Sequence, residues 1–181
     1  MESVLNDKPI STAEDLLTSG PRDDAFRIYL GMQPKKKVYI KNSDGTYSYN
    51  VPEIFEKYRG SDYEIIREDR SKDFIGLNYG GLHTNKSGIV EDDNGQKYFR
   101  MYDVWDLEPF KQYKRLPKPI RNMEIGRVIG RKPFVLDSFI PIKFDSEIRQ
   151  YITDIEAARN GVGYSIDKSK LRKTNLSYNN N

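Results

Sequence analysis

The chain has 181 residues, of which 36% are hydrophobic and 12% aromatic, and its formal charge is +3. This length favours one domain with extensions, and the low hydrophobic content predicts a modest core that relies on aromatic rings. There is no cysteine, which excludes disulfides, thiol catalysis and cysteine-based metal sites. We expect neither a signal peptide nor a membrane span, because no apolar run approaches the ~20 residues needed.

Two short helices are predicted near the N-terminus. The first begins at Ser11 with a capping-box spacing, and the second runs from Pro21 to Gly31. Helices of this length need a surface on which to dock. Residues 1–35 are therefore expected to form an N-terminal arm with short helices.

The middle of the chain reads mainly as strands and hairpins, because apolar and polar residues alternate between turn-forming residues. The clearest turn signal is Asn94-Gly95, which joins two apolar stretches. The predicted elements, in order, are a hairpin over 35–51, a helix over 52–60, strands over 62–68 and 74–84, a hairpin over 87–107, a loop over 108–133, and strands over 132–139 and 140–144 split near Pro141.

A longer helix is predicted next, capped by Asp145 and ended by Asn160-Gly161. Its apolar residues fall at i, i+3, i+4 and i+7, which is typical of one helix face: Ile148, Tyr151, Ile152 and Ile155. The remaining residues, 162–181, form a basic polar tail with few apolar side chains. This order predicts an α+β fold, in which a small antiparallel hairpin sheet over 36–161 carries short helices and flexible terminal arms.

The most aromatic stretch, YFRMYDVWDLEPF, contains the single tryptophan, Trp105, between Asp103 and Asp106. On a regular strand the two aspartates point to opposite faces, so they converge only if the strand bends or ends between them. Two interpretations stay open. In the first, the aspartates are structural and Trp105 is buried, packed against the apolar stripe of the helix over 145–160 or against Phe134 and Leu136. In the second, they work with His83, the only histidine, as a general acid–base site.

A basic stretch follows the acidic one. Residues 91–108 hold six acidic and two basic side chains, whereas 111–132 hold eight basic and one acidic. A solvated or interface-forming loop is the simpler interpretation, and nucleic-acid contact through this loop and the basic tail is the alternative. The candidate binding residues are Trp105, Lys111, Lys114, Arg115, Arg131 and Lys132. No motif predicts a cofactor or a metal ion.

Part of the chain resembles virion proteins of tailed phages that infect gut Bacteroidetes, including crAss-like phages. The resemblance spans roughly Asp23 to Ile142 and centres on a D-x-W-D-L-x-P-F run followed by a Gly-Lys-Pro-Phe segment. The matching residues are Asp103, Trp105, Asp106, Leu107, Pro109 and Phe110, then Gly130, Lys132, Pro133 and Phe134, with Arg131 inserted. It implies a virion structural, assembly or cargo-type protein, made in the bacterial host cytoplasm, that acts through contacts with other virion proteins.

The Asp-x-aromatic-Asp run is also similar to the active-site run of colicin M-like hydrolases, which cleave the lipid-linked peptidoglycan precursor. Asp103 and Asp106 take the matching positions. That family has a histidine downstream of the run, whereas here His83 lies upstream of it. This resemblance implies, as the alternative function, a hydrolase that acts on a cell-envelope substrate.

Overall fold

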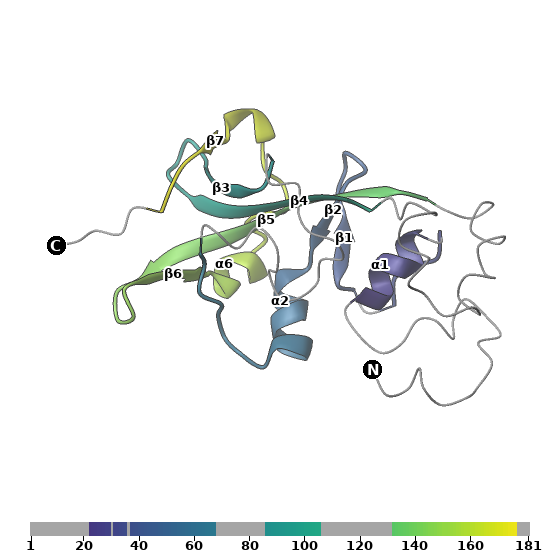
Figure 1. The fold of residues 1–181 in the computed structure, drawn as a ribbon, viewed down its shortest axis with the longest axis horizontal. Coiled ribbons are helices and arrows are strands. Elements are labelled where there is room, and N and C mark those ends of the chain that lie inside the picture. Colours follow the sequence, from purple (N-terminus) through teal and green to yellow (C-terminus); the bar gives the residue numbers. More distant parts are fainter. Residues whose placement is uncertain (1–21, 30, 36, 68–85, 106–131, 177–181) are drawn as a thin grey trace, which may run out of the picture. The chain divides into compact units, whose positions relative to one another are not determined.

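The computed structural model describes residues 22–29, 31–35, 37–67, 86–105 and 132–176, and the chain forms two compact units. The first unit comprises Met1–Lys36 with Trp105–Phe134, and the second comprises Lys37–Val104 with Val135–Asn181. The predicted α+β class is confirmed, because a seven-stranded sheet is combined with a few short helices (Figure 1). The arm before residue 22, the strand over 74–84 and most of the loop over 108–133 lie outside the described residues.

The sheet has the strand order β1-β2-β5-β4-β3-β7, and β6 also pairs with β5. The strands are β1 (Tyr39–Lys41), β2 (Tyr47–Tyr49), β3 (Gly88–Glu91), β4 (Lys97–Trp105), β5 (Phe134–Asp145), β6 (Gln150–Thr153) and β7 (Arg172–Lys173). The pairs β1–β2, β3–β4, β3–β7 and β5–β6 are antiparallel, as predicted, whereas β2 and β5 run parallel. Parallel strands cannot be joined by a tight turn, so this pair is formed by residues far apart in the sequence.

The pairing of β2 with β5 depends on side-chain hydroxyls. In the register of these two strands, Tyr47 lies opposite Leu136. Beside it, the backbone N–H of Tyr49 donates to the Ser138 Oγ at 3.0 Å, and the Ser48 hydroxyl donates to the Asp137 carbonyl at 3.4 Å. Two serines thus extend a short ladder across the middle of the sheet.

The first unit contains α1 (Arg22–Tyr29), which confirms the predicted second helix. Gly31 has φ +73° and donates to the Ile28 carbonyl, while Met32 donates to the Arg27 carbonyl. This pair of hydrogen bonds forms a Schellman motif, which requires a residue in the left-handed conformation after the helix. The sequence DDAFRIYLG therefore encodes both the helix and its end.

Both predicted hairpins are confirmed, and their loops have the same hydrogen-bond pattern. In residues 42–46 and 92–96, the first residue donates to the carbonyl of the fifth, and the glycine in fourth place donates to the carbonyl of the first. Gly45 and Gly95 have φ values of +85° and +82°. A turn followed by a left-handed glycine is typical of a hairpin with a G1 bulge. Asn94-Gly95 therefore lies in a five-residue loop rather than in a two-residue turn.

The predicted break near Pro141 is wrong, since β5 runs without interruption from Phe134 to Asp145. Pro141 lies between Leu136, which pairs with β2, and Ile142, the first residue that pairs with β6. A proline lacks the N–H that a ladder needs, but it is tolerated where a strand changes neighbours. The strand therefore passes through the proline.

The predicted helix from Asp145 is also wrong over its first half. The chain turns after β5 and returns as β6, and Phe144 packs edge-to-face on Tyr151 with ring centroids 5.3 Å apart. The Asp145 carboxylate accepts from the N–H groups of Glu147 and Ile148, so it stabilises a turn. The helix is α6 (Ile155–Arg159), and Asp154 caps it by accepting from the Ala157 N–H at 3.1 Å.

The helix predicted over 52–60 is present as α2 (Val51–Ile54), continued by the π-helix η2 (Phe55–Arg59) and ended by Gly60 at φ +62°. The strand predicted over 62–68 is reduced to a single bridge between Ile65 and Ile152. Its backbone still bonds to β6, because Ile66 donates to the Tyr151 carbonyl at 2.8 Å. This segment therefore covers the edge of β6 without forming a regular strand.

Candidate functional site

Of the two aspartates that the sequence singles out, the structure describes Asp103. Asp103 lies on β4 with 6% of its surface exposed, and one carboxylate oxygen accepts from the Val104 N–H at 2.9 Å. Asp106 and His83 lie outside the described residues. The burial pattern of β4 confirms that Asp103 shares the buried face with Phe99 and Met101. The grouping of Asp103, Asp106 and His83 stays a prediction.

Trp105 is buried, as predicted, with 3% of its surface exposed. Its ring stacks on Phe134 with centroids 5.8 Å apart and an interplanar angle of 8°. Lys132 is exposed, and its backbone N–H donates to the Tyr29 carbonyl at 2.6 Å. The other predicted binding residues lie outside the described residues: Lys111, Lys114, Arg115 and Arg131.

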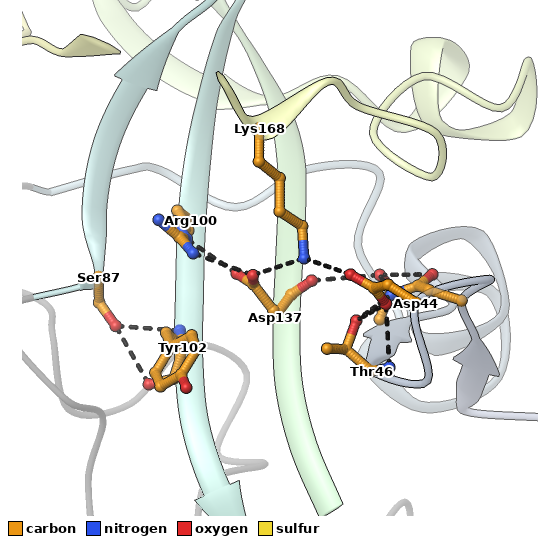
Figure 2. A network of polar contacts seen from close by, with 9 residues as sticks. Asp44, Thr46, Ser87, Arg100, Tyr102, Asp137 and Lys168 are labelled. Atoms are coloured by element: carbon orange, nitrogen blue, oxygen red, sulfur yellow. Dashed lines mark hydrogen bonds and ion pairs between the residues drawn. The ribbon is translucent and has the colours of Figure 1, made fainter. Parts of the chain in front are cut away.

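A polar cluster in the second unit joins four segments that are distant in the sequence. We call it the Asp137 cluster, and it consists of Asp44, Arg100, Asp137 and Lys168 (Figure 2). Asp44 is in the β1–β2 loop, Arg100 on β4, Asp137 on β5, and Lys168 begins the 3-10 helix η4 (Lys168–Lys170). Strand pairing accounts for the meeting of Arg100 and Asp137, because β4 and β5 are neighbours.

Asp137 is the centre of this cluster, with 4% of its side chain exposed. Arg100 donates to its two carboxylate oxygens from Nε and Nη2, at 2.8 and 2.9 Å. Lys168 lies 2.8 Å from the same carboxylate. A buried carboxylate is stable only when its charge is paired and hydrogen-bonded, and the two-bond arginine contact is the strongest geometry for this.

Lys168 also joins Asp137 to the first hairpin. Its Nζ donates to an Asp44 carboxylate oxygen at 2.8 Å, across 124 residues of sequence. This bond is the largest cause of the lowered pKa of Asp44, followed by the bonds from Thr46. Partial burial lowers the pKa of Lys168, but its bonds to the two carboxylates outweigh this and leave that pKa raised. Lys168 is therefore held as a cation.

An aromatic ring lies beneath the two cations. Arg100 is 5.1 Å and Lys168 5.8 Å from the centroid of the Phe139 ring, which packs edge-to-face on Tyr98 at 6.5 Å. Cations within about 6 Å of an aromatic face are attracted by its quadrupole. Nearby, the Lys86 ammonium lies 4.3 Å from the centroid of the Tyr102 ring. The sheet face thus combines cations with aromatic rings.

The Ser87 side chain continues the pairing with β4 at the residue before β3 begins. Its hydroxyl accepts from the Tyr102 N–H at 3.0 Å and donates to the Tyr102 carbonyl at 3.3 Å (Figure 2). A single side chain thereby satisfies both backbone groups of one strand residue, as a neighbouring strand would.

The charges of the Asp137 cluster balance, with two cations against two carboxylates. Such an arrangement fixes distant segments to one another and leaves little reason for proton transfer. Among the described residues, no three His, Cys, Asp or Glu side chains group closely enough to hold a metal ion. The cluster therefore serves the architecture of the second unit.

The sequence reasoning missed the residues of this cluster, although one signal pointed to it. Asp137 is the one charged residue in the run FVLDSFIPI, and a carboxylate inside an apolar strand must have a cationic partner. Arg100 alternates with aromatic residues on the neighbouring strand and is the natural candidate. Nothing in the sequence indicates that Lys168 completes the cluster, because it lies in a polar segment rich in lysine.

A scan against protein-family models, a search of curated proteins and a search of solved structures each found no match to this chain. Within the part of the chain that the structure describes, no helix is long and apolar enough to cross a membrane.

Proposed function

We propose that this protein is a structural or assembly component of a phage virion and acts through protein–protein contacts. The observation that carries the proposal is the end of the β5–β6 hairpin, where Phe144 and Ile148 are 41% and 40% exposed. Phe144 is on paired backbone and packs on Tyr151 from the adjacent strand, and Ile148 lies in the turn that joins the two strands. Neighbouring exposed apolar side chains on a fixed scaffold favour association with another protein.

The Asp137 cluster supports binding rather than catalysis. Its buried carboxylate is matched by Arg100 and Lys168, so the described polar centre stabilises the fold. The virion setting comes from the phage resemblance of the D-x-W-D-L-x-P-F run, in which Trp105 is buried and stacked on Phe134.

The proposal is tested in virions of a phage that encodes this chain. We expect the protein in purified particles by mass spectrometry, and we expect Phe144→Ser/Ile148→Ser to lower its incorporation roughly tenfold, equivalent to a loss of about 1.4 kcal/mol of binding energy. The control is Tyr58→Ser/Tyr63→Ser, which changes two other exposed aromatic residues. Particles without the protein would refute the proposal.

The alternative proposal is a hydrolase that acts on a lipid-linked peptidoglycan precursor. A specific observation in its favour is the burial of Asp103, since carboxylates in such surroundings are candidates for acid–base work. It predicts that Asp103→Asn abolishes hydrolysis of the precursor while the melting temperature is retained. A wild-type chain that leaves the precursor intact removes this alternative.

Contact with nucleic acid through the basic loop and tail is a further proposal on partners. Binding of this kind weakens steeply as salt rises, because condensed counterions are released from the phosphates. Titration of the chain with DNA at low and high salt tests it, and absence of binding at low salt would reject it.

A further inference from the structure

The chain after α6 forms a segment that we call the C-terminal strap, residues 162–176, which contains η4 and β7. It begins with apolar contacts to the sheet. Val162, Ile166 and Leu171 are partly buried against a cluster that consists of Val90, Tyr98 and Phe139. The strap thus covers apolar side chains from three different strands of the second unit.

Backbone pairing attaches the strap to the edge of the sheet. Its strand β7 runs antiparallel to β3, with Lys173 opposite Val90 and Arg172 opposite Glu91. The Thr174 N–H then donates to the Ile89 carbonyl at 3.1 Å. Beyond β3, the strap supplies the last strand in the sheet order. The strap therefore occupies an edge that any extended chain could pair with.

Ion pairs also attach the strap to the rest of the second unit, which we call the body. Lys168 of the strap contacts Asp137 and Asp44 of the body, and Arg172 contacts Glu91 at 3.2 Å. Glu91 also pairs with Lys97 of β4. In these contacts with the body, the strap supplies the cations and the body supplies the carboxylates. The covered surface is thus apolar at its centre and has three carboxylates around it, of which Asp137 and Glu91 also pair with the body cations Arg100 and Lys97.

We propose that the C-terminal strap is exchanged between copies of this chain, so that the strap of one copy binds the sheet of another. The covered surface fits a segment that can pair as a strand, that is basic and that has apolar side chains at intervals. The strap of a second copy has the same residues, so it would make the same contacts. The proposal deepens the proposed function, on which it rests, by naming a second copy as the partner of this surface.

The connection between α6 and the strap suits such an exchange. Gly161 and Gly163 have φ values of +86° and +101°, and glycine adopts both these and extended conformations at little cost. Gly163 also approaches the sheet closely, because a Cβ there would lie 2.2 Å from the Phe139 carbonyl oxygen. A change of backbone conformation at Gly163 would redirect the residues after it, while the Val162 N–H stays bonded to the Ala157 carbonyl of α6.

The absence of cysteine from the sequence allows a direct test. One chain carries Glu91→Cys and a second, tagged to differ in mass, carries Arg172→Cys, so the disulfide between positions 91 and 172 can form only between chains. Because docking holds the two sulfurs at a high effective concentration, we expect its yield to exceed that of random collision by ~10²-fold. The control mixes Glu91→Cys with Glu147→Cys, which is exposed in the β5–β6 turn.

A yield equal to the control at every protein concentration would overturn the proposal. A second arm uses Glu91→Cys/Arg172→Cys in one chain, in which oxidation locks the strap on its own sheet. We expect the locked chain to stay monomeric on gel filtration where the reduced chain forms dimers, and equal dimerisation of both would also overturn the proposal. A chain that exchanges its strap but is missing from virions would refute the proposed function alone.

Discussion

The two hairpin loops of the second unit share one backbone geometry but use their aspartates differently. In residues 42–46, Asp44 is the third residue, accepts from the N–H and hydroxyl of Thr46, and reaches out to Lys168. In residues 92–96, Asp92 is the first residue and accepts from the N–H groups of Asn94 and Gln96. Each aspartate thus stabilises its own loop, and Asp44 of the first loop adds a long-range contact.

The position of the carboxylate within the loop accounts for this difference. An aspartate in first place faces the backbone amides of its own turn, as in an Asx-turn, and the second oxygen of Asp92 then accepts from the buried Tyr98 hydroxyl at 3.1 Å. An aspartate at the tip projects away from the strands, so Asp44 is available to another segment. The same turn can therefore serve local stability or tertiary attachment.

Among the changes to the two loops, Asp92→Ala should lower the free energy of unfolding the most. It removes the acceptor for two backbone amides and for a buried hydroxyl, and each buried donor left without a partner costs about 1–3 kcal/mol. We expect a loss of about 2–3 kcal/mol in the free energy of unfolding, measured by denaturant melts. The control is Asp93→Ala at the exposed neighbouring position. Equal melts for the two variants would show that the second loop does not depend on its aspartate.

High pH should weaken the second loop specifically. Burial, followed by the bond to Asp92, raises the pKa of Tyr98 to about 12 from 10.0. The folded state therefore holds the Tyr98 proton more tightly than the unfolded state does. Its contribution, ~2 kcal/mol if the shift is complete, is present below pH ~10 and is lost as the pH rises toward ~12. Tyr98→Phe should remove this part of the pH dependence in thermal melts between these values.

Replacing either loop glycine, Gly45 or Gly95, by alanine should cost the same stability, because the backbone geometry of the two loops is the same. Each has a positive φ, and a Cβ at either position would meet nothing within 4 Å. The cost of Gly45→Ala and of Gly95→Ala is therefore that of the left-handed backbone alone, about 1–2 kcal/mol each. Matched denaturant melts measure this, and a difference above ~0.5 kcal/mol would show that the loops differ in backbone strain.

Asp44→Ala should have the smallest effect on global stability and a visible effect on the strap. The ion pair with Lys168 is largely exposed, and such pairs contribute about 0.2–1 kcal/mol. We expect faster proteolysis after Lys168 or Lys170, because the strap loses one attachment. Asp62→Ala, at an exposed position on another segment, is the control. Unchanged cleavage would show that Asp137 alone holds Lys168.

Low pH should weaken the contact between the Asp44 carboxylate and Lys168. The folded chain lowers the pKa of Asp44 below its ordinary value of 3.8, so its contribution is present above about pH 4 and is lost as the pH falls below that value. Strap cleavage by an acid-active protease should rise over this interval in the wild type and remain high throughout in Asp44→Ala. Since Tyr98 titrates near the opposite end of the scale, the two loops are separable by pH alone.

Local signals in the sequence predicted the local structure well. Gly31 marked the end of α1, and the turn residues Asn42–Gly45 and Asn94-Gly95 marked the two hairpins, because each of these places needs a residue in the left-handed conformation. The apolar spacing gave a wrong prediction of a helix at β6, where the residues fit both a helical and a strand pattern. Tyr151, Ile152 and Thr153 are buried in succession on β6, as on a strand covered on both faces, although Tyr151 and Ile152 also fit a helical stripe.

Local sequence signals did not predict the contacts of the Asp137 cluster. The need for a partner at Asp137 is readable from its apolar surroundings, but the choice of Lys168 depends on how the strap crosses the sheet. The register of β2 against β5 likewise depends on tertiary packing, since parallel strands share no turn that could set it. Local propensity predicts the elements, and chain topology decides which charges meet.

The serine-assisted pairing of β2 with β5 also bears on the order of folding. Its two hydroxyl bonds each join residues 89 positions apart, whereas the hairpin pairs close within a few residues. Hairpins form in about 1–10 μs, while contacts of large sequence separation must first overcome the entropy of closing a long loop. The β1–β2 and β3–β4 hairpins should therefore form early, and their union through β5 should be the slow, rate-limiting step for the whole sheet.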